Sequence, residues 1–394
     1  MGIAYMDRCE LKHAAERKIT IWEKELKKLA LDLWNHPEQA WHETYAAKTL
    51  CNYLNTHGIR TVSNYCGIPT AFRGECGNRE GAVFALAAEY DALPPGHACG
   101  HNLIAAASVG AMCAASAVMR ENNLPGKLVI LGTPAEESGG GKVKMLERGA
   151  LQGIDAVMMA HPGWCTIPDR GSLAIRRYDV SFHGVSSHAA GSPELGRNAL
   201  DAVLTLFNGV NAFRQQMPEF CRIHGIITQG GDMPNIIPGE ASCRFYLRSA
   251  NEDWMEKIDR RFSEIVQGAA LIAGTAFTQK KFSIDCRSRK PNRILNESYV
   301  TEITELGETI SPIPQAGRAS SDFGDFSQAI PGAHPYFAIS DRKIGAHSPE
   351  FMEAARSERG LEAMLKAAAA LAVTACRFLA EPDFRNAVKK DFES

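Results

Sequence analysis

The amino-acid sequence predicts an α/β fold with a mostly parallel central sheet flanked by helices, interrupted by an inserted ferredoxin-like domain. Three features indicate this fold. Strands and helices alternate in the first part of the chain, which is typical of a parallel sheet with helices on both faces. The middle part has the β-α-β-β-α-β order of a ferredoxin-like sandwich. Candidate metal ligands occur on both sides of that middle part, so we expect it to be an insertion.

Apolar patterns predict the elements of the first part. Apolar positions recur at helical spacing in two early segments, the second of which ends at Gly58. Continuous apolar runs predict buried strands, because a parallel sheet is covered on both faces. The expected elements are helices at 16–34, 42–57 and 102–120, and strands at 82–91, 127–133 and 155–161.

The insertion and the last part of the chain are predicted in the same way. The insertion is expected to contain strands at 172–184, 222–230, 241–250 and 277–285, and helices at 198–216 and 253–274. A strand at 334–340 and an Ala-rich helix at about 357–379 then resume the α/β pattern. A chain of 394 residues is also too long for one ordinary core. We therefore place the first domain at 1–175 and 287–394, and the inserted domain at 176–286.

Composition excludes several classes of protein. Hydrophobic content of 45% and charged content of 22% are typical of a soluble globular protein. A formal net charge of −2 argues against a nucleic-acid partner. No apolar run approaches the roughly 20 residues of a membrane span, so no membrane partner is expected. The start of the chain has no apolar stretch after its charges, and the 11 cysteines lack paired spacing, so we expect reduced thiols and a cytoplasmic location.

Four segments carry side chains that bind metals. They are EYDALPPGHACGHN at 89–102, GTPAEESGGGK at 132–142, AHP at 160–162 and AHSPEF at 346–351. Zinc and similar ions bind imidazole, thiolate and carboxylate together. Hydrolysis also needs one carboxylate that stays off the metal to move protons. The candidate residues are Cys99, His101, Glu136, Glu137, His161 and His347.

Each candidate also has a simpler interpretation. Cys99 and His101 flank Gly100, which allows both to turn toward one point, but in isolation they would be a buried thiol and a loop histidine. The Glu136–Glu137 pair alone would be a solvated acidic loop; next to a buried strand, one carboxylate can ligate while the other faces the open coordination position. His161 alone would be a core histidine and His347 a loop residue. Their joint occurrence favours a metal site. The carboxyl ends of parallel strands form such sites.

Other residues are candidates for supporting roles. Asp91 follows a predicted strand and is expected to orient a ligand imidazole, or else to cap the strand end. His188, on a Gly/Ser-rich turn of the insertion, is a candidate oxyanion donor or a plain loop histidine. Asn235 and Arg248 are candidates for binding a substrate carboxylate, although an arginine on a strand, such as Arg248, is more often an ordinary surface residue.

Taken in order, these motifs resemble the co-catalytic zinc or manganese metallopeptidases that include aminoacylases, plant indole-acetyl-amino-acid hydrolases and p-aminobenzoyl-glutamate hydrolase. The resemblance covers nearly the whole chain and includes NIIPGEA, SSDFGDFS at 320–327 and the segments quoted above. It implies the catalytic ligands Cys99, His101, Glu137, His161 and His347, with Glu136 as general acid/base. It also implies an inserted lid and dimerisation domain, with His188 acting from the partner subunit and Asn235 and Arg248 contacting substrate.

One position narrows the resemblance. Asn102 follows His101, where many relatives have Asp. With Asn at this position, the chain resembles the aminobenzoyl-glutamate hydrolase and dipeptidase sub-branch more than the auxin-conjugate sub-branch. The function expected is hydrolysis of an amide bond in a small N-acyl amino acid, aminobenzoyl-glutamate-like conjugate or dipeptide. The expected cofactors are two divalent ions, zinc or manganese, with cobalt or nickel also suited. The alternatives are a metallo-carboxypeptidase acting on longer peptides, and a non-catalytic homologue that binds amino-acid conjugates.

Overall fold

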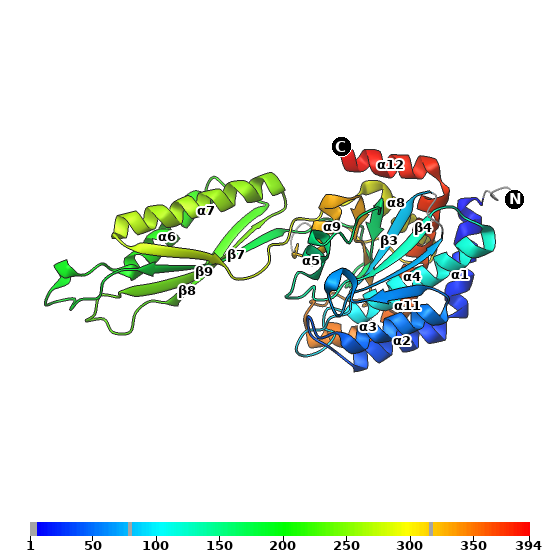
Figure 1. Ribbon diagram of the computed structural model, residues 1–394, viewed down its shortest axis with the longest axis horizontal. Coiled ribbons are helices and arrows are strands. Elements are labelled where there is room, and N and C mark those ends of the chain that lie inside the picture. The colour runs from blue at the N-terminus through cyan, green and yellow to red at the C-terminus, as the bar shows by residue number, and fades with distance from the viewer. Residues whose placement is uncertain (1–5, 78–80, 315–317) are drawn as a thin grey trace. The chain divides into compact units, whose positions relative to one another are not determined.

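The computed structural model describes residues 6–77, 81–314 and 318–394, which form two compact units (Figure 1). Unit 1 comprises Met1–Gly171, Lys290–Gly317 and Asp325–Ser394. Unit 2 comprises Ser172–Arg289 and Arg318–Gly324. Unit 2 therefore interrupts unit 1 in the sequence, which is the insertion that the predicted fold requires.

A six-stranded sheet forms the centre of unit 1. Its strands are β1 (Arg60–Ser63), β2 (Phe72–Gly77), β3 (Val83–Ala88), β4 (Lys127–Gly132), β5 (Ala156–Met158) and β11 (Gly332–Ala333). They lie in the order β1-β2-β4-β3-β5-β11. The four strands from β4 to β11 are parallel, whereas β1 and β2 add an antiparallel edge. The mostly parallel sheet predicted from the apolar runs is confirmed. A second, two-stranded parallel sheet pairs β6 (His161–Gly163) with β12 (Tyr336–Ala338).

Helices flank this sheet (Figure 1). They are α1 (Arg8–Ile21), α2 (Glu23–Asn35), α3 (Thr44–Thr56), α4 (His101–Asn122), α5 (Gly141–Glu147), α8 (Arg293–Glu305), α10 (Pro349–Ala354), α11 (Glu358–Ala380) and α12 (Pro382–Glu393); α9 (Phe323–Ala329) begins in unit 2. The single helix predicted at 16–34 is in fact two, because the backbone breaks at Trp22 with φ −100° and ψ 11°. The sequence patterns did not predict β1, β2, α5, α8 or α12.

Two helices of unit 1, α4 and α11, are long and apolar enough to span a membrane by length and composition alone. This corrects the expectation that no apolar run approaches that length. Their most apolar windows are 100% and 78% buried inside the protein, and the two helices pack against each other. A helix that is apolar on all sides is typical of the core of a large domain, so packing accounts for their composition.

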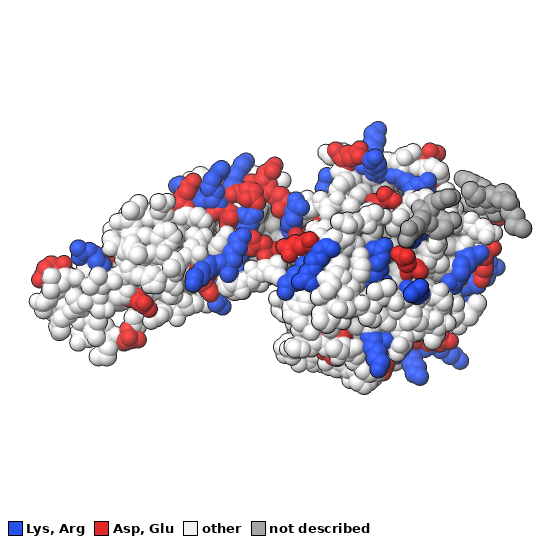
Figure 2. All heavy atoms as spheres, viewed as in Figure 1, with Lys and Arg blue, Asp and Glu red and all other residues white. Residues whose placement is uncertain are grey.

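Unit 2 has the predicted ferredoxin-like topology. Its elements are β7 (Ala174–His183), α6 (Ala199–Arg214), β8 (Cys221–Gln229), β9 (Glu240–Ser249), α7 (Glu252–Ala273) and β10 (Ala276–Lys281). The strands form an antiparallel sheet in the order β10-β7-β9-β8. Alternate strand residues such as Val180 and Phe245 pack with Phe262 of α7 in a separate core. The outer surface of α7 carries mixed acidic and basic side chains (Figure 2).

Two helix glycines of unit 2 provide a test of this packing. A Cβ on Gly268 of α7 would meet no atom within 4 Å, whereas a Cβ on Gly209 of α6 would lie 2.5 Å from Cγ2 of Ile265. Gly268→Ala should therefore stabilise unit 2 by about 0.5–1 kcal/mol, because alanine loses less backbone entropy in a helix. Gly209→Ala should destabilise it despite the same gain in propensity. Urea unfolding of the two variants measures this, and equal effects would contradict the packing of α6 on α7.

Candidate metal centre

Cys99 and His101 lie where the loop after β3 meets the N-terminus of α4. Gly100 between them has a left-handed φ of 76°, and a Cβ there would lie 2.6 Å from Cγ of Pro162. Only glycine accommodates both the conformation and the close approach. The backbone reversal at Gly100 is what allows Cys99 and His101 to face one point, as the sequence predicted.

Glu136 and Glu137 lie on a tight turn between β4 and α5. Ala135, just before them, is buried and has a φ of 59°, which is uncommon for a residue with a Cβ. The glycines that follow allow the turn to close on itself, because a Cβ on Gly141 would lie 1.8 Å from the carbonyl oxygen of Pro134. The turn is therefore strongly constrained, and it fixes the backbone positions of Glu136 and Glu137.

The two remaining histidines come from distant parts of unit 1. His161 begins β6, and its Nδ1 lies 2.7 Å from the carbonyl oxygen of Pro162. His347 lies in the loop before α10, with a φ of 64°, and its backbone N–H donates to the carbonyl oxygen of Ala98 at 2.9 Å. That backbone bond attaches the His347 loop directly beside Cys99.

The structure brings all six candidates together. Sγ of Cys99 lies 3.6 Å from Nε2 of His161. Oε1 of Glu137 lies 3.8 Å from Nε2 of His101 and 3.6 Å from Nε2 of His347. Within each of three overlapping groups, the ligand-type atoms lie within 4.8 Å of one another. The groups are Cys99, His101 and His161; Cys99, Glu137 and His347; and His101, Glu136 and Glu137.

The chemistry of these atoms fits divalent cations. Nε2 of His101 and Oε1 of Glu137 are buried, and neither has a hydrogen-bond partner within the described part of the chain. An unsatisfied buried acceptor costs free energy unless something binds it. Cysteine thiolate, imidazole and carboxylate are also the ligands of zinc and its neighbours. Groups that overlap through Cys99, His101 and Glu137 are suited to a pair of ions.

Without a cation, the electrostatics favour the wrong protonation states for ligation. Burial raises the pKa of the Cys99 thiol. Burial lowers the pKa of His101, but the charges of Cys99 and Asp91 outweigh it and raise that pKa above its ordinary value. A bound cation reverses both effects, since ligation requires thiolate and neutral imidazole. Ion binding at this site should therefore release protons.

Asp91 connects two of the ligand-bearing segments. Its Oδ1 lies 3.0 Å from Nδ1 of His101, and its Oδ2 accepts the backbone N–H of Glu137 at 2.9 Å. The side chain is buried. The first contact leaves Nε2 of His101 facing the other ligands, which is the orienting role predicted for Asp91. The second contact is an addition that the sequence did not predict.

Sequence reasoning missed a buried ion pair at the same site. Nζ of Lys142 lies 2.5 Å from Oε1 of Glu89, and both side chains are fully buried. Oε2 of Glu89 lies 3.7 Å from Nε2 of His101. The sequence did contain a signal for Glu89, because this carboxylate lies two residues before Asp91, just after the same strand. Lys142 gave no such signal, because lysine is rarely buried.

A third missed residue is Glu43, the residue before α3. It is fully buried, and its Oε1 accepts the backbone N–H of Ala135 at 2.8 Å. Burial raises the pKa of Glu43 to about 7, and the negative charge of Asp91 adds to the rise. Glu43 lies outside the four segments that carry the candidate ligands, so the sequence patterns predicted no role for it.

Three predicted residues lie in unit 2 and are described there alone. Nδ1 of His188 accepts the N–H of Gly191 at 2.9 Å, so the neutral ring carries its proton on Nε2. Asn235 is next to it, since its carbonyl oxygen accepts the N–H of Ala189 at 2.9 Å. Arg248 donates to Oγ of Ser320 at 3.0 Å. These contacts leave the predicted roles of His188, Asn235 and Arg248 as predictions.

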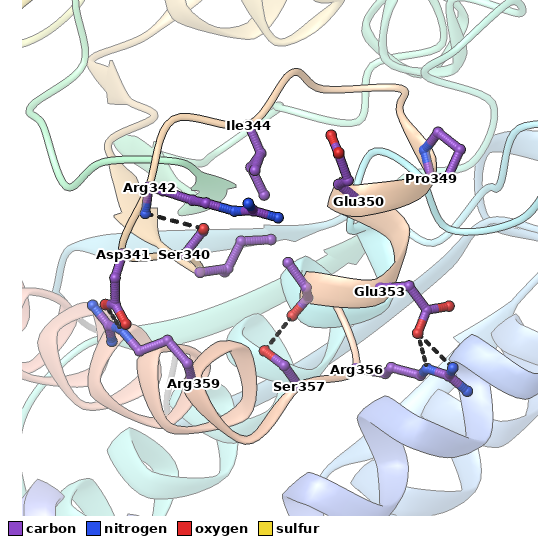
Figure 3. Close-up of a pocket in the computed structure, with 12 residues that line it drawn as sticks. Ser340, Asp341, Arg342, Ile344, Pro349, Glu350, Glu353, Arg356, Ser357 and Arg359 are labelled. Atoms are coloured by element: carbon purple, nitrogen blue, oxygen red, sulfur yellow. Dashed lines mark hydrogen bonds and ion pairs between the residues drawn. The ribbon is translucent and has the colours of Figure 1, made fainter.

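A cavity of about 730 Å³ lies beside the segment that carries His347 (Figure 3). None of the six candidate ligands lines it. Two of its arginines are already paired: Arg356 with Glu353, and Arg359 with Asp341 at 3.5 Å and Glu308 at 2.6 Å. Because none of the candidate ligands lines it and these arginines are already paired, the cavity is not the metal centre.

Comparison with known proteins agrees with this geometry. Residues 85–373 match peptidase family M20/M25/M40. The chain is 35% identical to the Xaa-Arg dipeptidase of Mus musculus over 398 residues, covering 97% of this chain and 92% of the relative. It is 31% identical to one of the subunits of p-aminobenzoyl-glutamate hydrolase from Escherichia coli, covering 71% of this chain and 62% of the relative. Its fold is similar to that of the Bacillus subtilis YXEP protein, a dinuclear metal-binding peptidase, with a TM-score of 0.70 at 21% identity, covering 91% of this chain and 99% of the other.

The raised pKa of Glu43 predicts a pH-dependent difference between the wild type and Glu43→Gln. The pKa rises from 4.5 to about 7, so the fold favours the protonated carboxyl. Its contribution to stability is fully present below pH 4.5 and is lost as the pH rises through about 7. Glutamine stays neutral, so the variant should gain stability relative to the wild type between pH 5 and pH 8, by up to roughly 3 kcal/mol. Unfolding of both metal-loaded proteins at the two pH values measures this, and a difference independent of pH would refute it.

Proposed function

The chain belongs to peptidase family M20/M25/M40, and we propose that it hydrolyses the amide bond of a small N-acyl amino acid, aminobenzoyl-glutamate-like conjugate or dipeptide. Membership of this family makes the protein a metallopeptidase or amidohydrolase. The observation that carries the proposal is the cluster of thiolate, imidazole and carboxylate atoms around Glu136 and Glu137. An intact pair of adjacent carboxylates argues against a homologue that only binds its ligand.

We propose that two divalent ions, zinc or manganese, are held by Cys99, His101, Glu137, His161 and His347. The overlapping groups within 4.8 Å support this assignment. Ions bound there would polarise the scissile carbonyl and lower the pKa of a water molecule. The protein supplies the rest: Asp91 holds the His101 ring, and the backbone bond from His347 to Ala98 holds the two ligand loops together.

Glu136 is proposed as the general acid/base. It is half-buried and adjacent to Glu137, and its carboxylate lies within the group that includes His101. Because neighbouring side chains on a turn diverge, Glu137 can face the cations while Glu136 faces the reacting water. Glu136 would accept a proton from that water and return it to the leaving amine.

The relatives favour small substrates over long peptides. The mouse protein is a dipeptidase and the Escherichia coli protein acts on p-aminobenzoyl-glutamate, as their names state. We therefore propose a substrate with one amide bond and a free carboxylate, for which Arg248 and Asn235 of unit 2 are the proposed contacts. A screen of dipeptides with varied C-terminal residues, aminobenzoyl-glutamate and acetyl-amino acids would identify it. Equal or faster cleavage of longer peptides would instead favour a carboxypeptidase.

We also propose that unit 2 forms a homodimer. Strand β8 is the last strand of its sheet, so one row of its backbone groups has no neighbouring strand. Ile226 and Ile227 on this strand are 62% and 44% exposed. Exposed apolar side chains on an open sheet edge are typical of a surface that pairs with another chain.

Substitution of each glutamate of the pair should separate the two roles. Glu136→Gln should keep its metal content and lose about 10²–10⁴-fold in kcat, because glutamine cannot carry the proton. Glu137→Gln should instead lose metal, because a carboxylate ligand is replaced by a weaker one. Metal analysis and steady-state kinetics on the same preparations distinguish them.

Removal of metal with a chelator provides the control for the Glu136 and Glu137 variants. Activity should vanish in metal-free protein and return when zinc or manganese is added to the wild type. It should return only weakly in Glu137→Gln. Reversed phenotypes for the two variants would exchange their roles, and full activity in verified metal-free protein would exclude the mechanism.

His188 allows a test of the dimer and the lid together. With Nδ1 accepting from Gly191, its Nε2–H can serve as the donor, so His188→Ala should lower kcat by about 10²–10³-fold, as loss of an oxyanion donor does. If the donor comes from the partner subunit, a mixture of His188→Ala and Glu136→Gln proteins should regain activity, because one site of each hybrid dimer then has both residues. No recovery after confirmed subunit exchange would place His188 in its own subunit or outside the reaction.

A further inference from the structure

We propose that Glu43 is a positioning residue for the general base: an oxygen of its carboxyl group accepts the backbone N–H of Ala135 and thereby helps to set the direction of Glu136. The inference rests on the proposed function, because it takes Glu136 as the general acid/base. It adds a residue that lies 93 positions before Glu136 (136 − 43) and outside the motifs that contain the ligands.

The contact itself is buried and specific. Oε1 of Glu43 accepts the N–H of Ala135 at 2.8 Å, and both residues are 0% exposed. Ala135 has a φ of 59°, a conformation that costs free energy for a residue with a Cβ and persists only where its surroundings hold it. The Glu43 carboxylate is the group that binds the N–H of this strained residue.

The same turn is held on its other side by a second carboxylate. Oδ2 of Asp91 accepts the N–H of Glu137 at 2.9 Å. The N–H groups on either side of Glu136 are thus bound by two buried carboxylates, Glu43 and Asp91. The first bond holds the Pro134–Ala135 peptide group and the second holds the Glu136–Glu137 peptide group. The backbone is thus held on both sides of Glu136, which restricts the direction of its Cα–Cβ bond.

Packing around Glu43 brings its segment against both catalytic loops. The carbonyl oxygen of Glu38 accepts the N–H of Ala92, next to Asp91, at 2.7 Å. A Cβ on Gly139 would lie 2.5 Å from Nε1 of Trp41 and 2.6 Å from Cβ of Ala135. The backbone of Glu38 and the ring of Trp41 therefore connect the loop that carries Asp91 to the turn that carries the glutamate pair.

The side chain of Glu43 does not cap the helix that it precedes. Although it is the N-cap residue of α3, its side chain makes no capping hydrogen bond. The carboxylate of Glu38 does that, since it accepts the N–H groups of Tyr45 at 3.0 Å and Ala46 at 2.9 Å. The two glutamates of one segment thus divide two tasks, helix capping and positioning, and Glu38 is a matched control for Glu43.

The experiment compares metal-loaded wild type with Glu43→Leu, Glu43→Asp, Glu43→Gln and Glu38→Leu, with Glu136→Gln measured alongside. Glu43→Leu removes the acceptor and should lower kcat by about 10–10²-fold with KM within about threefold and metal content unchanged, because a displacement of about 1 Å in a catalytic group costs up to about that much. Glu43→Asp, shorter by one methylene group, should fall between Glu43→Leu and the wild type. Glu43→Gln keeps an acceptor oxygen and should restore most of the lost kcat. Glu38→Leu should lower the melting temperature but leave kcat unchanged.

Each outcome decides between the two proposals. Wild-type kcat in Glu43→Leu, or in Glu43→Asp if the leucine variant does not fold, would overturn the positioning role while inactive Glu136→Gln leaves the proposed function standing. An active Glu136→Gln would instead refute the assignment of the general base. If Glu38→Leu loses as much kcat as Glu43→Leu, general destabilisation of the segment explains both losses. That outcome would also overturn the inference.

Discussion

The buried carboxylate of Asp91 is the interaction on which the site depends. One oxygen faces the ring of His101 at the start of α4, and the other binds the backbone of Glu137 on the turn after β4. A carboxylate has two oxygens in a fixed geometry, so these contacts set the distance between the two ligand segments. The parallel sheet makes this possible, because β3 and β4 are neighbours and their carboxyl ends lie side by side. The position of the site therefore depends jointly on the order of the strands, on the backbone reversal at Gly100 and on the direction of the His101 ring.

Much of this was predictable from the sequence, for a physical reason. Buried parallel strands appear as continuous apolar runs, and the residues that follow them are polar. Asp91 and the proposed ligands Glu137 and His161 follow that rule, because they come shortly after β3, β4 and β5. His97 shows the converse: it lies among the ligand motifs but is a buried histidine whose Nε2 lies 3.1 Å from the carbonyl oxygen of Leu33.

The residues that sequence reasoning missed act through tertiary contacts. Glu43 reaches the turn at Ala135 from a segment 92 residues away, and Lys142 reaches Glu89 across two strand ends. No local periodicity encodes such pairs. The break at Trp22 was missed for a different reason, since α1 and α2 keep a helical apolar pattern on either side of it. The roles of His188, Asn235 and Arg248 stay predictions, because they depend on contacts with a substrate that neither composition nor spacing describes.

The insertion of unit 2 within unit 1 has a consequence for how the protein is made. α4 is buried from His101 to Met119 and packs on α11, which lies more than two hundred residues later in the chain (358 − 122 = 236). During synthesis, the apolar surface of α4 therefore waits for its partner while the whole of Ser172–Arg289 emerges, a nearly continuous segment with its own core. Domains fold as units as they leave the ribosome. The second unit to be started is thus the first able to finish, and the first unit remains open, with its His347 loop still to come, until the last part of the chain is translated.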